Sequence, residues 1–100
     1  MNNLRKFYIN GAWVDPIEST DFEVIHPGNE EVIATLALGS AKDVDAAVAA
    51  AKEAFKTWQF SSVDERVALL ERILKEYEAR AEEFIRVMPH EMGTTMSFSR

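Results

Sequence analysis

The two histidines, His26 and His90, are the side chains of this sequence best suited to acid–base or metal chemistry. An imidazole changes its charge near neutral pH and is a common metal ligand. The two residues are far apart in the sequence, however, and neither belongs to a pair with the spacing of metal ligands. We therefore expect structural roles for both, in a turn for His26 and at a helix end for His90.

Thiol chemistry is excluded from these residues because the sequence contains no cysteine, which also rules out a disulfide scaffold and a cysteine-rich zinc site. The glycines Gly28, Gly39 and Gly93 fit neither G-x-G-x-x-G nor G-x-x-x-x-G-K-S/T, so they indicate turns and caps instead of a phosphate site. Trp13 and Trp58 could stack on a ligand, but a tryptophan in a hairpin or at the end of an apolar helical stripe is typical of packing. No residue of the sequence is a candidate for catalysis or cofactor binding.

Length and charge narrow the class of protein further. The 100 residues suffice for one modest domain, and the formal net charge of -6 would repel nucleic acid and anionic membrane surfaces. No apolar run approaches the roughly 20 residues that span a bilayer, and the opening MNNLRKFYING lacks the apolar core of a signal peptide. The expected location is the cytoplasm, with no nucleic-acid or membrane partner.

Two pairs of antiparallel strands are predicted between residues 7 and 38. The runs Phe7–Ile9 and Ala12–Val14 flank Asn10-Gly11, the dipeptide that best adopts the positive φ angles of a tight hairpin turn. After a polar connection over 17–21, strand-forming residues at 22–25 lead into the turn residues 26–29, and a second run follows over 31–38. These two runs predict the second strand pair.

Two amphipathic helices are predicted next, over about 41–58 and 63–88, each with apolar residues at helical spacing. Ser40 with Asp43 forms a capping-box pattern at the start of the first helix, and Ser62 with Glu65 forms one at the start of the second. Ser61 is also expected to act as a cap. Because Pro89 cannot donate to the carbonyl of residue 85, the second helix should end or kink just before it. The predicted fold class is α+β, with two short antiparallel strand pairs followed by two antiparallel helices.

These segments together resemble one family. FYINGAWV is similar to the opening hairpin of the NAD(P)-dependent aldehyde dehydrogenase superfamily, and FEVIHPGNEEVIATLALGS to its next strand pair. DVDAAVAAAKEAFKTW and DERVALLERI resemble the first two helices, and HEMGTT resembles the acidic residue and glycine that close this region. His26 departs from the pattern, since an asparagine usually precedes the proline there, and Pro89 interrupts a helix that family members usually keep intact. The resemblance covers nearly the whole chain and identifies it as an N-terminal segment.

The resemblance implies an oxidoreductase that converts an aldehyde to a carboxylic acid with NAD or NADP, through a cysteine thioester formed outside this chain. Residues 1–100 would be a single partial domain, the N-terminal part of the cofactor-binding domain. Its partners would be the remainder of the subunit and further copies in a homo-oligomer. We expect the 100 residues alone to be inactive and to bind no cofactor.

One ligand site is also implied by the resemblance. Some family members hold a structural monovalent cation with main-chain oxygens at positions matching Val24 and Ile25, together with an acid matching Glu91. Hard oxygen ligands suit such an ion. By its residue type alone, Glu91 would be a solvent-facing acid near a helix end.

A second class of function stays open on the residues alone. The same helices could form a non-catalytic helical-hairpin module that binds a partner or oligomerises through an apolar face. A truncated segment would leave helix faces and strand edges uncovered, and we expect it to self-associate.

Overall fold

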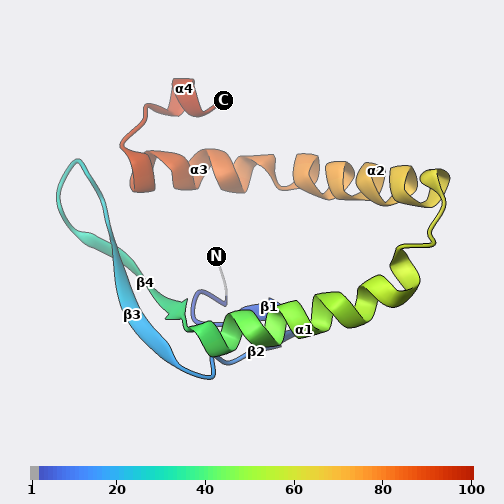
Figure 1. The fold of residues 1–100 in the computed structure, drawn as a ribbon. Helices are drawn as coiled ribbons and strands as arrows, with labels where there is room; N and C mark the ends of the chain where they lie inside the picture. The colour runs from blue at the N-terminus through green and yellow to red at the C-terminus, as the bar shows by residue number, and fades with distance from the viewer. Residues whose placement is uncertain (1–2) are drawn as a thin grey trace. The chain divides into compact units, whose positions relative to one another are not determined.

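The computed structural model describes residues 3–100 and arranges them in two compact units (Figure 1). One unit contains the residues up to Val24 together with Ala34–Gln59, and the other contains Ile25–Ile33 and Phe60–Arg100. The elements, in chain order, are β1 (Phe7–Ile9), β2 (Ala12–Val14), β3 (Ser19–Ile25), β4 (Val32–Gly39), α1 (Ala41–Trp58), α2 (Val63–Ala79), α3 (Ala81–Met92) and α4 (Met96–Ser99). The two strand pairs and the following helices confirm the predicted fold class.

The first hairpin forms as the sequence predicts. β1 pairs antiparallel with β2, with Tyr8 opposite Trp13, and the two rings make an edge-on contact at 5.3 Å between centroids. Asn10 and Gly11 form the turn with φ angles of 53° and 76°. Positive φ at both central residues is the requirement of the turn whose twist matches a hairpin, so this dipeptide fixes the register.

β3 and β4 form a second two-stranded sheet whose strands meet at the predicted turn. The turn is closed by two backbone hydrogen bonds, from His26 N–H to the Glu31 carbonyl and from Glu30 N–H to the His26 carbonyl, both 2.9 Å long. β3 begins at Ser19, so the polar connection expected over 17–21 is shorter than predicted. Pairing with the eight-residue β4 gives these polar residues hydrogen-bond partners that the sequence pattern could not indicate.

Helix α1 has the predicted bounds, and Ser40 is its N-cap. Helix α2 begins with the second predicted capping box: Glu65 N–H donates to Ser62 Oγ at 3.1 Å, and Ser62 N–H donates to Glu65 Oε2 at 2.7 Å. Each bond satisfies a backbone donor that a helix start leaves unpaired. The expectation that Ser61 also caps a helix is wrong, since Ser62 alone occupies the N-cap position of α2.

Removing this cap should weaken α2. The variant Ser62→Ala is expected to lose about 1 kcal/mol of helix stability, because the Glu65 N–H loses its acceptor. Faster amide hydrogen exchange at Glu65 and lower helix content by circular dichroism would show the loss. Ser61→Ala is the matched control and should leave both unchanged; an equal effect of the two variants would contradict the assignment of the cap.

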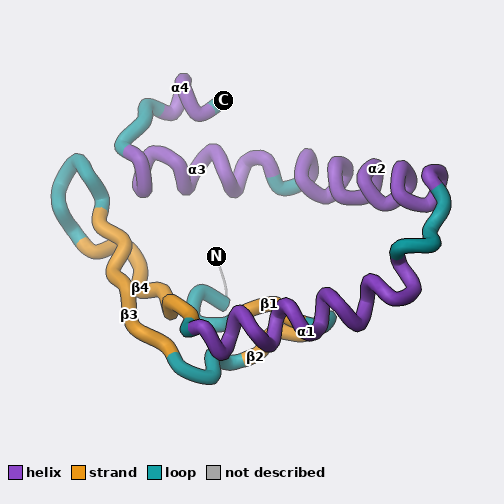
Figure 2. Tube along the Cα trace, viewed as in Figure 1, coloured by secondary structure: helices purple, strands orange, loops and turns teal. Residues whose placement is uncertain are grey.

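The prediction of one helix over 63–88 is wrong. The chain forms two helices, which meet at Arg80, and Figure 2 shows the short break between α2 and α3. Arg80 has φ -110° and ψ 10°, and its N–H donates to the Tyr77 carbonyl three residues back instead of continuing the α-helical pattern. Its guanidinium instead makes two hydrogen bonds to Glu83 in the first turn of α3, at 3.1 and 2.8 Å. The break is thus confined to one residue.

Pro89 does not end the helix, contrary to the sequence expectation. α3 continues through Pro89 to Met92 and stops at Gly93, which adopts φ 70° and donates its N–H to the Pro89 carbonyl at 3.0 Å. A proline removes one helical hydrogen bond but keeps its own carbonyl as an acceptor, so the last turn can still close. The left-handed glycine, not the proline, terminates α3.

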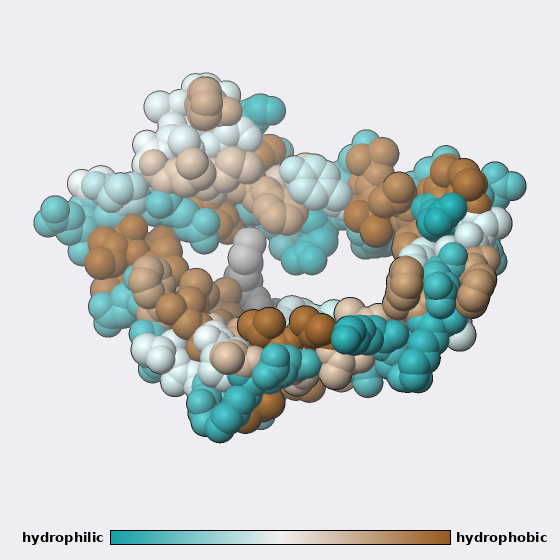
Figure 3. Space-filling view, viewed as in Figure 1, coloured by the Kyte–Doolittle hydropathy of each residue, from teal (hydrophilic) through white to brown (hydrophobic). Residues whose placement is uncertain are grey.

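Little of the described chain is buried. Ala37 is the only buried hydrophobic residue and Asp43 the only buried charged one among residues 3–100. Brown, hydrophobic side chains reach the surface over α2 and over the β3–β4 pair in Figure 3.

No helix within residues 3–100 combines the length and apolar character needed to cross a bilayer. Because α1 and α2 belong to different compact units, the antiparallel packing expected of the two helices stays a prediction.

Candidate functional site

The residues of the predicted cation site lie on β3 and α3. Val24 is half-buried near the end of β3, Ile25 ends that strand with half of its surface exposed, and Glu91 is exposed in the last turn of α3. Contacts within one compact unit join the segments that carry Ile25 and Glu91: the His26 and His90 rings meet, and Pro27 lies against Gly93. Residues 3–100 contain no group of three histidine or carboxylate side chains placed to hold a metal.

The two histidines lie in contact, although their separation in the sequence had suggested that they act independently. Their ring centroids are 5.7 Å apart in an edge-on arrangement. His26 also has the turn role predicted for it, because its Nδ1 accepts the Gly28 N–H at 2.9 Å. That bond places the proton of neutral His26 on Nε2, so Nε2 offers no lone pair to a metal. No sequence signal predicts this pairing, since it arises only when the β3–β4 turn packs on α3.

Asp43 forms the most connected polar site of the other unit. Its Oδ2 accepts hydrogen bonds from the Ser40 backbone N–H at 2.9 Å and from the Ser40 hydroxyl at 3.0 Å. Its Oδ1 accepts the Ile17 N–H at 2.7 Å, across 26 residues of sequence. Only 6% of the residue is exposed. The capping-box pattern accounts for the bond from the Ser40 N–H. The expectation that the Ser40 hydroxyl accepts from a helix amide is wrong, because that hydroxyl donates to the Asp43 carboxylate. No pattern indicated Ile17. One carboxylate therefore joins the β2–β3 connection to the start of α1.

The charge of Asp43 is stabilised by these donors. The Ser40 and Ile17 backbone N–H groups hold the pKa of its carboxyl below the ordinary value of 3.8. Because the pKa of Asp43 is lower in the folded chain than in the unfolded chain, its charge stabilises the fold. This contribution is complete at pH values above the unfolded-state pKa and is lost as the pH falls through the folded-state pKa. The hydrogen bonds of Asp43 therefore make the stability of the fold decrease at acidic pH and not at alkaline pH.

Substitution of Asp43 by asparagine tests this linkage. In the parent chain, the Ile17 amide proton shift should titrate with a midpoint below pH 3.8, and the stability of α1 should fall over the same range. The variant Asp43→Asn should be less stable near neutral pH and should lose this acid transition. Asp45→Asn, an exposed position of the same helix, is the control and should keep it. An unchanged transition in Asp43→Asn would assign the acid sensitivity to another group.

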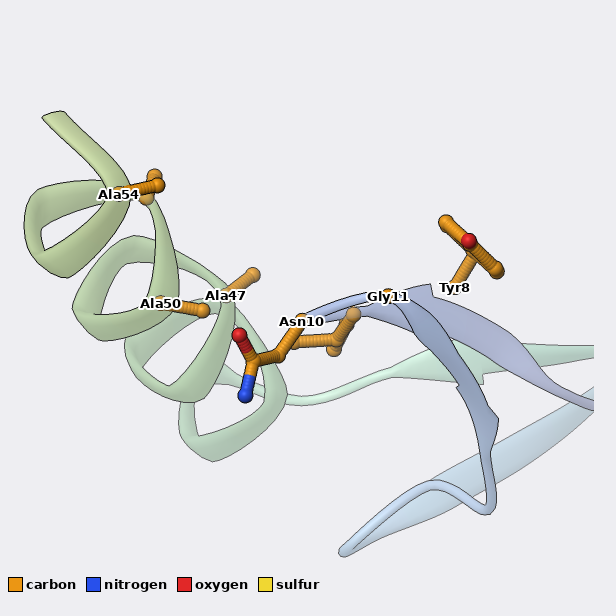
Figure 4. Close-up of a pocket in the computed structure, with 8 residues that line it drawn as sticks. Tyr8, Asn10, Gly11, Ala47, Ala50 and Ala54 are labelled. Atoms are coloured by element: carbon orange, nitrogen blue, oxygen red, sulfur yellow. The ribbon is translucent and has the colours of Figure 1, made fainter. Parts of the chain in front are cut away.

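An open hollow of about 490 Å³ lies between the first hairpin and α1. Figure 4 shows the Asn10 side chain extending toward the face of α1 that carries Ala47 and Ala50. The polar side chains of its lining are the Asn10 amide and the Tyr8 hydroxyl; the rest is aliphatic or glycine. The lining holds no cation for a phosphate, and its mostly aliphatic surface suits packing.

Comparison with known proteins identifies one family. The sequence model of the aldehyde dehydrogenase family matches residues 13–100. A relative from Staphylococcus aureus (strain bovine RF122 / ET3-1), whose name assigns it to the aldehyde dehydrogenases, is 43% identical over 99% of this chain and 21% of its own length.

Two crystal structures show the same fold. The aldehyde dehydrogenase of Bartonella henselae matches with a TM-score of 0.92 and 44% identity over 99% of this chain and 21% of that one. A mutant of aldehyde dehydrogenase C from Pseudomonas syringae, in complex with NAD+ and octanal, matches with a TM-score of 0.92 and 41% identity over 98% and 20%. The chain therefore spans about a fifth of the length of the relatives it matches.

The family model covers most of the chain, and the hairpin, the strand pair and the helices all have counterparts in the N-terminal part of these enzymes. The chain belongs to the aldehyde dehydrogenase family.

Proposed function

We propose that this chain is the N-terminal structural segment of an enzyme that oxidises an aldehyde to a carboxylic acid with NAD or NADP. The observation that supports this most strongly is the match of nearly the whole chain to one end of aldehyde dehydrogenase structures. In the proposed reaction the aldehyde carbon gains oxygen from water and gives a hydride to the nicotinamide, by way of a cysteine thioester. The chain has no cysteine, so the reacting thiol belongs to residues outside it.

The proposed role of these residues is to frame the cofactor-binding domain, of which they form a single partial domain. Asp43 joins the β2–β3 connection to the start of α1, and the alanines of α1 leave a shallow apolar face beside the first hairpin. Neither NAD nor NADP should bind this segment alone, because its glycines form no phosphate-binding loop and its hollow carries no cation. NAD+ is the nucleotide bound in the Pseudomonas syringae relative.

The partners that we propose are the remainder of the subunit and further copies of it in a homo-oligomer. The exposed apolar side chains of β3, α1 and α2 are those that a larger subunit would cover. A cytoplasmic location belongs to the same proposal, as does the absence of a nucleic-acid or membrane partner. The net charge of -6 supports that absence.

A monovalent cation site at Val24, Ile25 and Glu91 is also part of the proposal. Its support is the contact of the β3–β4 turn with the end of α3, which joins the segments that carry Ile25 and Glu91 within one compact unit. In the native protein, replacing sodium or potassium with choline should lower the melting temperature. The variant Glu91→Gln should abolish that difference. A cation dependence that Glu91→Gln leaves intact would place the ion elsewhere.

The decisive experiment captures the native protein from its source cells with an antibody against this segment. Its intact mass is measured, and NADH or NADPH formation is followed with octanal, betaine aldehyde and benzaldehyde. We expect a mass several times the 11.3 kDa of this chain, with aldehyde-dependent reduction of one nucleotide. The isolated 100-residue chain is the control and should show neither nucleotide binding by calorimetry nor activity.

A captured mass of 11.3 kDa without activity would overturn the enzyme proposal. It would favour the second candidate, a non-catalytic helical module that binds a partner or oligomerises. The observation that favours this candidate is the exposure of apolar residues along α2.

A further inference from the structure

The first hairpin turns at Asn10-Gly11, a pair of residues prone to spontaneous loss of the side-chain amide. In such a pair the backbone nitrogen of the glycine attacks the side-chain carbonyl carbon of the asparagine, because glycine has no side chain to hinder the approach. Both reacting atoms belong to adjacent residues of this chain. The reaction therefore needs no enzyme, no cofactor and no open surface for a partner.

The reaction has two steps, and neither needs an oxidant or a reductant. The Gly11 nitrogen loses its proton to solvent and forms a bond to Asn10 Cγ. The bond from Cγ to Nδ2 breaks, Nδ2 gains a proton and leaves as ammonia, and a cyclic imide remains. Water then opens the imide. Its addition at Cγ gives an aspartate, whereas its addition at the main-chain carbonyl carbon gives an isoaspartate, in which the backbone runs through Cβ and Cγ.

The turn holds the two reacting atoms apart. Asn10 and Gly11 have φ angles of 53° and 76°, the pattern of a type I′ turn, in which ψ of the first central residue is about 30°. Ring closure requires Cβ and the Gly11 nitrogen to lie on the same side of the Asn10 Cα–C bond. A ψ of about 30° places them on opposite sides. The reaction must therefore start from an open hairpin.

Pairing on both strands keeps the hairpin closed. Ile9 pairs with Ala12, next to the turn. Tyr8 pairs with Trp13, and their rings meet at 5.3 Å between centroids. An aromatic pair of this kind stabilises a strand pair beyond the area that it buries. These contacts are internal to residues 7–14, so they do not depend on what the rest of a longer subunit covers.

Either product would weaken the hairpin in which it forms. The Asn10 side chain extends toward the face of α1 that carries Ala47 and Ala50 (Figure 4), so an aspartate would place a charge beside a mostly aliphatic surface. An isoaspartate adds a methylene to the backbone of a turn that fixes the register of β1 and β2. Each converted chain should therefore open more readily than its parent.

We propose that Asn10 is a site of spontaneous deamidation and that opening of the β1–β2 hairpin sets its rate. Asn29 supplies the comparison within the same chain. It precedes Glu30, whose side chain hinders the attack, and Glu31 holds its amide by two hydrogen bonds of 3.1 Å. Deamidation depends on the hairpin and not on the enzyme activity proposed above, so either can fail without the other.

Ageing of the full-length native protein tests the site. Folded protein and protein unfolded in guanidinium chloride are incubated, and fragment-ion mass spectrometry then locates each exchange of an amide for a carboxyl group and each isoaspartate. We expect conversion at Asn10 and not at Asn29, roughly tenfold or more faster in the unfolded protein. Folded protein that keeps Asn10 intact, or that converts Asn29 as fast, would overturn the site. Equal rates in folded and unfolded protein would overturn the control by the hairpin.

Two tyrosine variants separate hairpin opening from general loosening of the fold. Tyr8→Ala removes the ring contact with Trp13 and should speed conversion in the folded protein about two- to tenfold, the factor by which loss of an aromatic pair shifts an opening equilibrium. Tyr77→Ala removes a ring contact with Phe84, also at 5.3 Å, in the other compact unit and should leave the rate unchanged. In guanidinium chloride the parent and both variants should convert at one rate. A rate in folded Tyr8→Ala no higher than in Tyr77→Ala would overturn the role of the hairpin.

Discussion

Replacing Pro89 with alanine is expected to stabilise α3 by about 2 kcal/mol. Pro89 lies in the third turn of α3 and lacks the N–H that would donate to the Ile85 carbonyl. An interior proline costs a helix about 3 kcal/mol, of which the greater freedom of alanine in the unfolded chain offsets roughly 0.4–1 kcal/mol. The amide of Gly93, which donates to the carbonyl of residue 89, should exchange roughly thirtyfold more slowly.

Pro16→Ala is the matched control. Pro16 lies in the connection between β2 and β3, where no helical hydrogen bond is missing. The change at Pro16 therefore acts through the greater freedom of alanine in the unfolded chain, so this variant should lose roughly 0.4–1 kcal/mol of folding stability. The two proline replacements should thus change stability in opposite directions. A loss of α3 protection in Pro89→Ala would show that the proline ring contributes packing that outweighs the missing hydrogen bond.

Gly93→Ala should destabilise the end of α3. Gly93 has φ 70°, a conformation that costs a residue with a Cβ about 1–2 kcal/mol. An added Cβ would also lie 3.0 Å from Pro27 Cγ, which would push the β3–β4 turn away from the helix. Both effects oppose the small gain from a less flexible unfolded chain. In this variant we expect faster hydrogen exchange of the backbone amide of residue 93 and of the Glu30 amide in the β3–β4 turn.

Gly11→Ala separates the two causes of this loss. Gly11 has a similar φ of 76° and nothing within 4 Å of an added Cβ, so it should show the conformational cost alone. Gly93→Ala should therefore cost more than Gly11→Ala. Combining Gly93→Ala with Pro27→Ala should remove the excess. Equal losses at Gly11 and Gly93 would mean that the turn yields to the new methyl group without cost.

The features that the sequence predicted correctly are those decided by neighbouring residues. The hairpin needs two residues that tolerate positive φ, and Asn10-Gly11 supplies both. The start of α2 needs a side-chain acceptor and an acid three residues later, which Ser62 and Glu65 supply. Each of these interactions joins residues that lie within four positions of each other, so the local sequence is sufficient to predict it.

The features that the sequence did not reveal depend on residues far apart or on small energy differences. The break at Arg80 falls among good helix formers, with neither glycine nor proline to mark it. Pro89 has a strong local preference against a helix interior, but the αL cap at Gly93 lets the last turn form. The His26–His90 contact joins two segments that no periodicity relates. The candidate cation residues came from the family resemblance, since backbone carbonyl ligands have no residue signature of their own.

The contacts of Asp43 have a consequence for synthesis on the ribosome. The hydrogen-bond donors of Asp43, among them Ile17 and Ser40, precede it in the chain, and the hairpin that it helps to hold ends at Val14. Nothing that is translated later is needed to complete this cluster. Because translation adds only about 5–20 residues per second, far more slowly than a hairpin or a helix forms, the cluster can close soon after Asp43 and the first turns of α1 leave the exit tunnel. The nascent chain then carries one ordered end while its other apolar surfaces are still exposed.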